Sequence, residues 1–174
     1  MTRRIVLVTG APGAGKSTLA GPLSVMLGFP LLSKDLIKES LHDSLAAPIG
    51  DLASSRRLGA AAMDLIWALA ARCPTAVLEA NSLPGHPDTR PRLDSLAADV
   101  VEVNCWCPPA EAARRYAARA AGGHHHPVHV VHELSPDVLA QYDRPLGYGP
   151  VITVDTTRPA DLPAIASQVR EAFR

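Results

Sequence analysis

The sequence has few cysteines, no excess of either charge and no long apolar run. Its 174 residues include three cysteines, Cys73, Cys105 and Cys107, and this odd count argues against a disulfide framework. The 17 Lys and Arg residues balance the 17 Asp and Glu residues, so no overall electric field recruits nucleic acid or an anionic membrane. The longest apolar candidate, residues 58–71, is interrupted by Asp64 and falls short of a membrane span. We therefore expect no nucleic-acid partner and no membrane association.

The chain also lacks internal repeats, and its only low-complexity segment is a run of three histidines. A length of 174 residues predicts one domain, residues 1–174, with room for a proper core. The N-terminus leads directly into the first expected strand and leaves no room for a signal peptide, so we expect a cytoplasmic protein.

The chain does contain a glycine-rich stretch, GAPGAGKST at residues 10–18, which fits the Walker A pattern G-x-x-x-x-G-K-[ST]. Residues 4–9 before it form a β-branched run that is typical of a buried parallel strand. Residues 17–27 after it carry apolar side chains at helical spacing. Strand, glycine loop and helix therefore occur in the order that a phosphate-binding loop requires.

This glycine loop predicts a nucleotide site with Mg²⁺. Gly13 and Gly15 let the backbone approach phosphate, and the loop N–H groups together with the helix N-terminus hold polyphosphate. Lys16 is expected to reach the β- and γ-phosphates, and the Ser17 hydroxyl to ligate Mg²⁺. The expected nucleotide-binding residues are Gly10, Ala11, Pro12, Gly13, Ala14, Gly15, Lys16, Ser17 and Thr18.

Strand and helix patterns alternate along the rest of the chain. Further strands are expected at residues 28–33, 75–80, 100–106 and 151–155. Further helices are expected at residues 34–45, 51–72, 88–98, 110–121, 135–142 and 160–173. We expect core positions at Leu36, Ile37, Leu41, Leu58, Ala62, Leu65, Ile66 and Leu69. This alternation predicts an α/β fold, a parallel sheet with helices on both faces, whose ligands bind outside the carboxyl ends of the strands.

Three polar residues follow the expected second and third strands and share the edge of the sheet with the glycine loop. Asp35 could accept a proton from an attacking hydroxyl or hold Mg²⁺ through water, or it could simply favour the helix dipole. Glu79 stands where a Walker B carboxylate would, for Mg²⁺ or substrate, although a buried carboxylate satisfied by neighbouring backbone is the alternative. Asn81 could bind substrate.

Arg115 and Arg119 are four residues apart on an expected helix and share one face. Paired guanidinium groups suit a transferring phosphate, and one of them could stack on adenine. A solvated helix face is the alternative.

The histidine segment that follows, residues 124–132, could be a mobile lid or a plain solvent loop. A metal site there is disfavoured, because three consecutive side chains cannot all face one ion.

The motifs together resemble the small P-loop kinases that include chloramphenicol phosphotransferases, zeta-toxin-like kinases and related AAA_33-type ATP-binding proteins. The resemblance is carried by residues 10–18, 33–35, 79–81, 115–119 and 154–157. It implies a sheet of order 2-3-1-4-5 and a phosphotransferase that moves the γ-phosphate of ATP to a hydroxyl of a small molecule, an antibiotic or a metabolite. It also implies a monomer or homodimer with a lid over residues 115–132.

The same resemblance implies roles for particular residues. Asp35 would be the catalytic base, aided by Lys16, Arg115 and Arg119, and Arg115 would also contact the nucleotide. Similar proteins carry an arginine before a His-Pro pair in the lid, and here that place holds His125. Acceptor-binding residues are expected to be Asp35, Glu79, Asn81, Arg90 and His126, with Glu79 also contacting Mg²⁺ through water.

Other functions remain open at this point. A nucleotide or nucleoside kinase and a zeta-toxin-like sugar-nucleotide kinase fit the same motifs, and so does a nucleotide-binding module without catalysis. A GTPase switch is disfavoured, because residues 104–108 read Asn-Cys-Trp-Cys-Pro rather than the guanine signature Asn-Lys-x-Asp. The sequence does not identify the acceptor.

Overall fold

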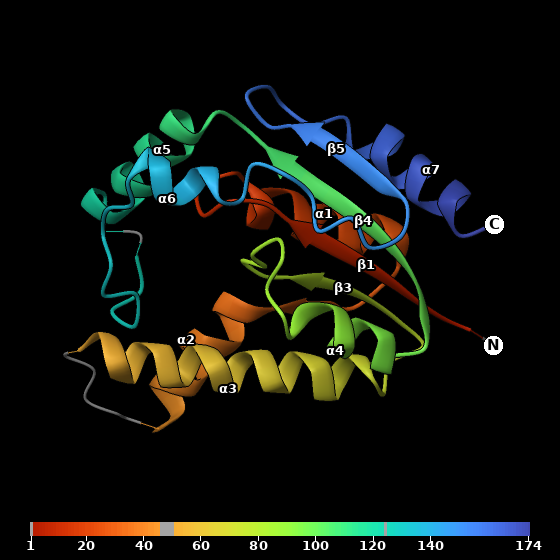
Figure 1. Ribbon diagram of the computed structural model, residues 1–174, viewed down its shortest axis with the longest axis horizontal. Helices are drawn as coiled ribbons and strands as arrows, with labels where there is room; N and C mark the ends of the chain where they lie inside the picture. The colour runs from red at the N-terminus through yellow and green to blue at the C-terminus, as the bar shows by residue number, and fades with distance from the viewer. Residues whose placement is uncertain (1, 46–50, 124) are drawn as a thin grey trace.

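A computed structural model describes residues 2–45, 51–123 and 125–174, so the predicted loop at 46–50 and His124 lie outside the described residues. Five parallel strands form one sheet in the order β2-β3-β1-β4-β5, which confirms the predicted topology (Figure 1). The strands are β1 (Arg3–Thr9), β2 (Leu31–Ser33), β3 (Thr75–Glu79), β4 (Ala98–Trp106) and β5 (Val151–Asp155).

The register of the central strands brings their carboxyl ends to one edge. Val8 of β1 is paired with Glu79 of β3 on one side and with Val103 of β4 on the other. Ser33, the last residue of β2, is paired with Glu79 as well. Glu79 therefore lies directly beside the point where the glycine loop leaves β1.

Helices cover both faces of the sheet (Figure 1). One apolar cluster packs β1 side chains such as Val6 and Val8 against α1, α5, α6 and α7. A second cluster packs Ile5 and Leu7 against α3 and α4, because alternate residues of a strand point to opposite faces. The helices are α1 (Lys16–Leu27), α2 (Lys34–Leu45), α3 (Leu52–Ala70), α4 (Thr89–Ser95), α5 (Pro109–Ala121), α6 (Pro136–Ala140) and α7 (Leu162–Ala172).

Three of the expected core positions are wrong. Leu36, Leu65 and Leu69 are 58%, 40% and 42% exposed. The buried positions of α3 are Ser55, Gly59, Ala62, Ile66 and Ala70, which recur every three or four residues. Leu65 lies about 100° and Leu69 about 60° around the helix from the middle of this face, so they flank the core instead of entering it. Within the described residues, no helix is both long and apolar enough to cross a membrane.

Candidate active site

The glycine loop joins β1 to α1 and depends on glycine at several positions. Gly10, Gly13 and Gly15 have φ angles of 131°, 85° and 83°, in the region that side chains disfavour. A Cβ on Gly10 would lie 2.2 Å from the carbonyl oxygen of Cys105, and one on Gly13 would lie 2.2 Å from that of Ala112. Any larger residue would collide with fixed backbone. The loop is therefore a cradle whose inner surface is bare backbone.

Lys16, the first residue of α1, is buried under this loop and donates a hydrogen bond to the carbonyl oxygen of Ala11 at 2.8 Å. Burial lowers the pKa of Lys16, while the negative charges of Glu79 and Asp35 act in the opposite direction. An ammonium group, a helix N-terminus and a glycine-rich backbone thus border one space. This donor set fits a polyphosphate.

Glu79 gathers two serine hydroxyls at the end of β3. Ser17 donates to Glu79 Oε1 at 3.1 Å, and Ser33 donates to Oε2. The carboxylate is buried, so this cluster joins the ends of β2 and β3 to the first turn of α1. A hydroxyl and a carboxylate beside a polyphosphate cradle are oxygen ligands of the kind that Mg²⁺ prefers.

Asp35 stands in the first turn of α2, directly after β2, with its side chain 32% exposed. Lys34 Nζ lies 3.3 Å from Asp35 Oδ1. Burial acts to raise the pKa of Asp35, but the positive charges of Lys34, His129 and Lys16 outweigh it, so the pKa lies below its usual value. A carboxylate in this environment is ionised at neutral pH and can accept a proton.

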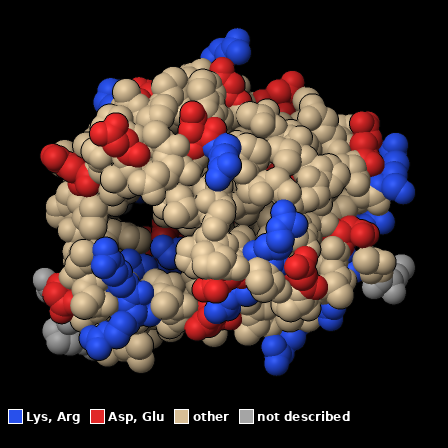
Figure 2. Space-filling view, in the orientation of Figure 1, with Lys and Arg blue, Asp and Glu red and all other residues tan. Residues whose placement is uncertain are grey.

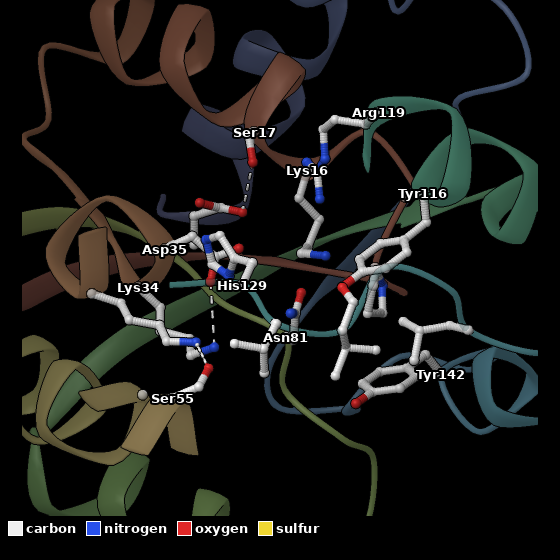
Figure 3. Close-up of a pocket in the computed structure, with 18 of the residues that line it drawn as sticks. Lys16, Ser17, Lys34, Asp35, Ser55, Asn81, Tyr116, Arg119, His129 and Tyr142 are labelled. Carbon is white, nitrogen blue, oxygen red and sulfur yellow. Dashed lines mark hydrogen bonds and ion pairs between the residues drawn. The ribbon is translucent and has the colours of Figure 1, made fainter. Parts of the chain in front are cut away.

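A cavity of about 840 Å³ connects the glycine loop, Asp35 and the opposite wall. Figure 3 shows Lys16, Asp35, Asn81 and Arg119 directed toward this shared space. Figure 2 shows it as a hollow, with Lys and Arg side chains gathered along its lower edge, over α2 and α3. The structure therefore places the nucleotide cradle and a candidate base in one cavity.

Arg115 and Arg119 both line the cavity from α5. Arg115 is held in place by Glu111 at 2.7 Å and by the carbonyl oxygen of Thr156 at 3.1 Å. Arg119 lies over the ring of Tyr116, 5.6 Å from its centroid, and reaches toward Lys16 (Figure 3). Arg115 is half-buried and Arg119 is exposed, so the role expected of these two arginines at a transferring phosphate stays a prediction.

Residues 125–132 cross from α5 to the opposite side of the cavity, where they contact α2 and α3 (Figure 1). His129 Nε2 lies 2.9 Å from Glu39 Oε1 of α2. Ser55 of α3 donates to the carbonyl oxygen of the buried Val128 at 2.7 Å. This segment therefore bounds the cavity on one side. We call residues 125–132 the lid for short, although a lid function for residues 115–132 stays a prediction.

Arg90 and His126, two of the expected acceptor-binding residues, do not line this cavity. Arg90 lies in α4 and stacks over the ring of Tyr148 at 5.3 Å. His126 is drawn to the last turn of α2, where Nε2 lies 3.0 Å from Asp43 Oδ1. The positions of Arg90 and His126 in the sequence were not enough to predict that they line the cavity, because each side chain is held by a partner outside it.

The histidines of the lid also give one cluster with metal-ligand spacing. Atoms of His42, Asp43 and His126 lie within 4.8 Å of one another. The backbone N–H of Val128 donates to His126 Nδ1 at 3.2 Å, so the ring proton belongs on Nε2, the nitrogen that faces Asp43. A protonated nitrogen does not ligate a metal. The cluster is a hydrogen-bonded bridge between the lid and α2.

His125 stands at the position where the resemblance described above implies an arginine. Its ring packs edge-on against Tyr116, with 4.9 Å between centroids. Burial, together with the positive charges around it, lowers the pKa of His125. A neutral imidazole cannot supply the charge of a guanidinium group, so positive charge on this side of the cavity comes from Arg115 and Arg119.

Several cavity residues were missed from the sequence. They are polar or aromatic side chains of α2, α3, α5, the lid and the segment before β5, namely Lys34, Lys38, Ser55, Arg56, Tyr116, His129 and Tyr142. A signal existed for one pair, because Lys34 and Lys38 stand one helical turn apart on the helix that Asp35 begins. The others are brought to the cavity by packing between elements that are distant in sequence.

Comparison with known proteins agrees with this geometry. Residues 5–145 match the family described as an AAA domain, AAA_33. The structure of a "putative kinase" from Chloroflexus aurantiacus is 29% identical to this chain over the full length of both, with a TM-score of 0.86. Two others are similar in fold: a Sinorhizobium meliloti gluconokinase (18% identity, 99% of this chain, 92% of that chain, TM-score 0.59) and the Mycobacterium tuberculosis APS kinase (20%, 99%, 98%, 0.60). No curated protein matches the chain in sequence. The chain therefore belongs to the AAA_33 family and has the fold of the P-loop kinases.

Proposed function

We propose that the protein is an ATP-dependent phosphotransferase that moves the γ-phosphate to an alcohol group of a small molecule, an antibiotic or a metabolite. One observation carries this proposal. Asp35, a carboxylate whose pKa is held below its usual value by neighbouring positive charge, shares a cavity with the glycine loop and Lys16. A nucleotide-binding module without catalysis has no need of an ionised carboxylate that faces its phosphate site.

The nucleotide side of the cavity is supplied by the glycine loop, Lys16, Ser17 and Glu79. ATP bound there supplies the transferable phosphoryl group, and Mg²⁺ offsets its negative charge. Ser17 and Glu79 offer oxygen ligands to the ion, directly or through water. Lys16 donates to a loop carbonyl and would exchange this bond for phosphate oxygens of a bound nucleotide.

Asp35 orients the acceptor and takes its proton. The acceptor oxygen forms a bond to phosphorus, the bond between phosphorus and the leaving oxygen of ADP breaks, and the hydroxyl proton goes to Asp35. Lys16, Arg115 and Arg119 stabilise the negative charge that is distributed over the transferring group. Segment 125–132 keeps bulk water away from the cavity, which favours transfer to the acceptor over hydrolysis.

The location and assembly of the enzyme are further parts of the proposal. Cys73, Cys105 and Cys107 are free thiols, which fits a reducing compartment such as the cytoplasm. For the assembly we propose a monomer or a homodimer.

The test is a coupled assay of ADP release with Mg²⁺ and a panel of hydroxylated antibiotics, nucleosides and sugars. We expect one class of compound to stimulate the wild type, and Asp35→Asn to lower turnover by about 10²-fold or more with ATP affinity retained. Lys16→Ala should abolish turnover. Asp137→Asn, an exposed carboxylate on α6 outside the cavity, is the control and should behave as wild type.

Two outcomes would count against the proposal. Near-normal turnover of Lys16→Ala would remove the P-loop kinase mechanism. Loss of ATP affinity in Asp35→Asn, with unchanged turnover per bound ATP, would make Asp35 a structural or metal-binding residue rather than a base.

A further inference from the structure

Two lysines converge on the wall of the cavity that faces away from the glycine loop. Lys34 and Lys38 lie one turn apart on α2 and pack against Gly59 of α3. A Cβ on Gly59 would lie 3.9 Å from Lys34 Nζ and 4.0 Å from Lys38 Cε, which is ordinary contact distance, so both side chains pass over this glycine. Both lysines line the cavity. Figure 3 shows Lys34 and Ser55 on this wall, with Asp35 above them.

Lys38 is buried without a carboxylate partner. It is 6% exposed, and its ammonium group donates to Ser55 Oγ at 2.7 Å, a neutral acceptor. Among residues 2–45, 51–123 and 125–174 it forms no ion pair. Burial and the charge of Lys34 lower the pKa of Lys38, and the charges of Asp35 and Glu39 do not offset them. A buried cation of this kind is costly unless a negative group completes its surroundings.

The charges of this wall add up to a positive excess. Arg56 of α3 lines it together with Lys34 and Lys38, and within the described part of the chain Arg56 forms no ion pair. Asp35 is the one carboxylate of the described residues that lines this side. Glu79 also lines the cavity, but its oxygens accept from two serine hydroxyls beneath the glycine loop. Polyphosphate satisfies the cations of the nucleotide side. On this wall the three cations face Asp35 within the cavity, and the other nearby carboxylate, Glu39, lies outside the lining and pairs with His129, so positive charge remains in excess.

We propose that the acceptor is an alcohol that also carries an oxyanion, a carboxylate or a phosphate ester, which binds to Lys38 and Lys34 with Arg56 at its edge. This inference rests on the proposed function and names the chemical class of the acceptor. Asp35 and Lys38 are three residues apart on one helix, an axial rise of about 4.5 Å. The reacting hydroxyl at Asp35 and the oxyanion at Lys38 are therefore separated by only a few carbon atoms.

The experiment compares three alcohols of the same length: glycerol, glycerate and glycerol 3-phosphate. Each is titrated by calorimetry into wild-type protein saturated with Mg²⁺ and the non-hydrolysable ATP analogue AMP-PNP, which keeps the probes out of the glycine loop. A charge-assisted contact predicts that at least one anionic probe binds about tenfold or more tightly than glycerol. The comparison of glycerate with glycerol 3-phosphate shows whether this wall prefers a carboxylate or a phosphate.

Variants assign that preference to this wall. Lys38→Gln keeps a donor for Ser55 but removes the charge, and should reduce the preference to less than about threefold, whereas Lys38→Arg should retain it. Arg56→Gln should weaken the anionic probes severalfold. Its matched control is Arg57→Gln, the next residue, which donates to Ser54 and does not line the cavity.

Equal affinity for the three probes, including no binding of any of them, would overturn the proposal, and so would an undiminished preference in Lys38→Gln. If thermal melting shows that Lys38→Gln is unfolded, the comparison of Arg56→Gln with Arg57→Gln tests the proposal instead. Equal affinity of these two variants for the anionic probes would then overturn the proposal. ADP release separates this inference from the proposed function. If an anionic probe binds but no compound of the panel is phosphorylated, the kinase alone is contradicted, and a neutral alcohol that is phosphorylated through Asp35 contradicts the oxyanion subsite alone.

Discussion

Replacing Glu102 by glutamine is expected to destabilise the protein by more than a typical point mutation does. Glu102 is fully buried in β4, and its carboxylate accepts three hydrogen bonds. The donors are the Thr9 hydroxyl at 2.6 Å and the backbone N–H groups of Leu146 and Gly147 at 2.8 and 2.9 Å. Thr9 is the last residue of β1 before the glycine loop, so this carboxylate fixes the base of the nucleotide cradle to the chain that leads into β5.

The magnitude follows from the three donors. Glutamine keeps one acceptor oxygen, and in either orientation its NH₂ group then faces the backbone N–H of Leu146 or that of Gly147, which leaves that buried donor unpaired. An unpaired buried donor costs about 1–3 kcal/mol, and the remaining bonds lose their charge-assisted strength. We expect a total loss of about 2–4 kcal/mol in the free energy of unfolding, against about 5–15 kcal/mol for a typical domain.

Urea unfolding followed by tryptophan fluorescence measures this loss. With an m-value of about 2 kcal/mol/M, the midpoint should fall by about 1–2 M at unchanged m. Thr9→Val, combined with Glu102→Gln in a double-mutant cycle, should show a coupling energy above about 0.5 kcal/mol. Glu171→Gln, an exposed residue of α7, is the control and should stay within about 0.5 kcal/mol of wild type. A loss below about 0.5 kcal/mol in Glu102→Gln, or additive effects in the cycle, would refute the reasoning.

Two further predictions concern titration and thiol reactivity. Because the pKa of Asp35 is lowered below its ordinary value of 3.8, its base form persists as the pH falls, so titration of Asp35 should cause no decline in kcat/KM for the stimulating acceptor between neutral pH and about pH 5. A decline near pH 6, with the circular dichroism spectrum unchanged, would exclude Asp35 as the group that titrates. Burial raises the pKa of Cys105 to about 12 and also raises the pKa of Cys107, so iodoacetamide at pH 8 should alkylate the partly exposed Cys73 first. Peptide mass mapping checks the order, and equal labelling of Cys105 and Cys73 would contradict it.

The order of strands and helices could be predicted because its signals are local. The glycine loop lies between a β-branched strand and an apolar helix, and the structure places it between β1 and α1. Helix α2 has the predicted bounds, residues 34–45. The strand order followed from the resemblance, since nothing within a strand states which neighbours it will have. The positions of Asp35 and Glu79 at one edge followed from the rule that parallel strands end together.

The details that depend on packing could not be predicted in the same way. Glu102 looked like one polar residue in an apolar strand, and its donors come from residue 9 and from residues 146 and 147. Leu65 and Leu69 matched a helical period, but the rotation of α3 on the sheet decided which positions are buried. Arg90 and His126 had suitable chemistry and suitable sequence positions, yet partners outside the cavity hold them.

Helix α2 connects the separate parts of the proposed site. Its first turn carries Asp35, the next turn carries Lys38, and Glu39 holds His129 of the lid. Lys38 donates to Ser55, and the Ser55 hydroxyl donates in turn to the carbonyl oxygen of Val128 in the lid. An acceptor anion on Lys38 would thus be two hydrogen bonds away from the backbone of the segment that bounds the cavity. The base, the anion subsite and the lid therefore share one rigid element, so a shift of α2 would displace all three together.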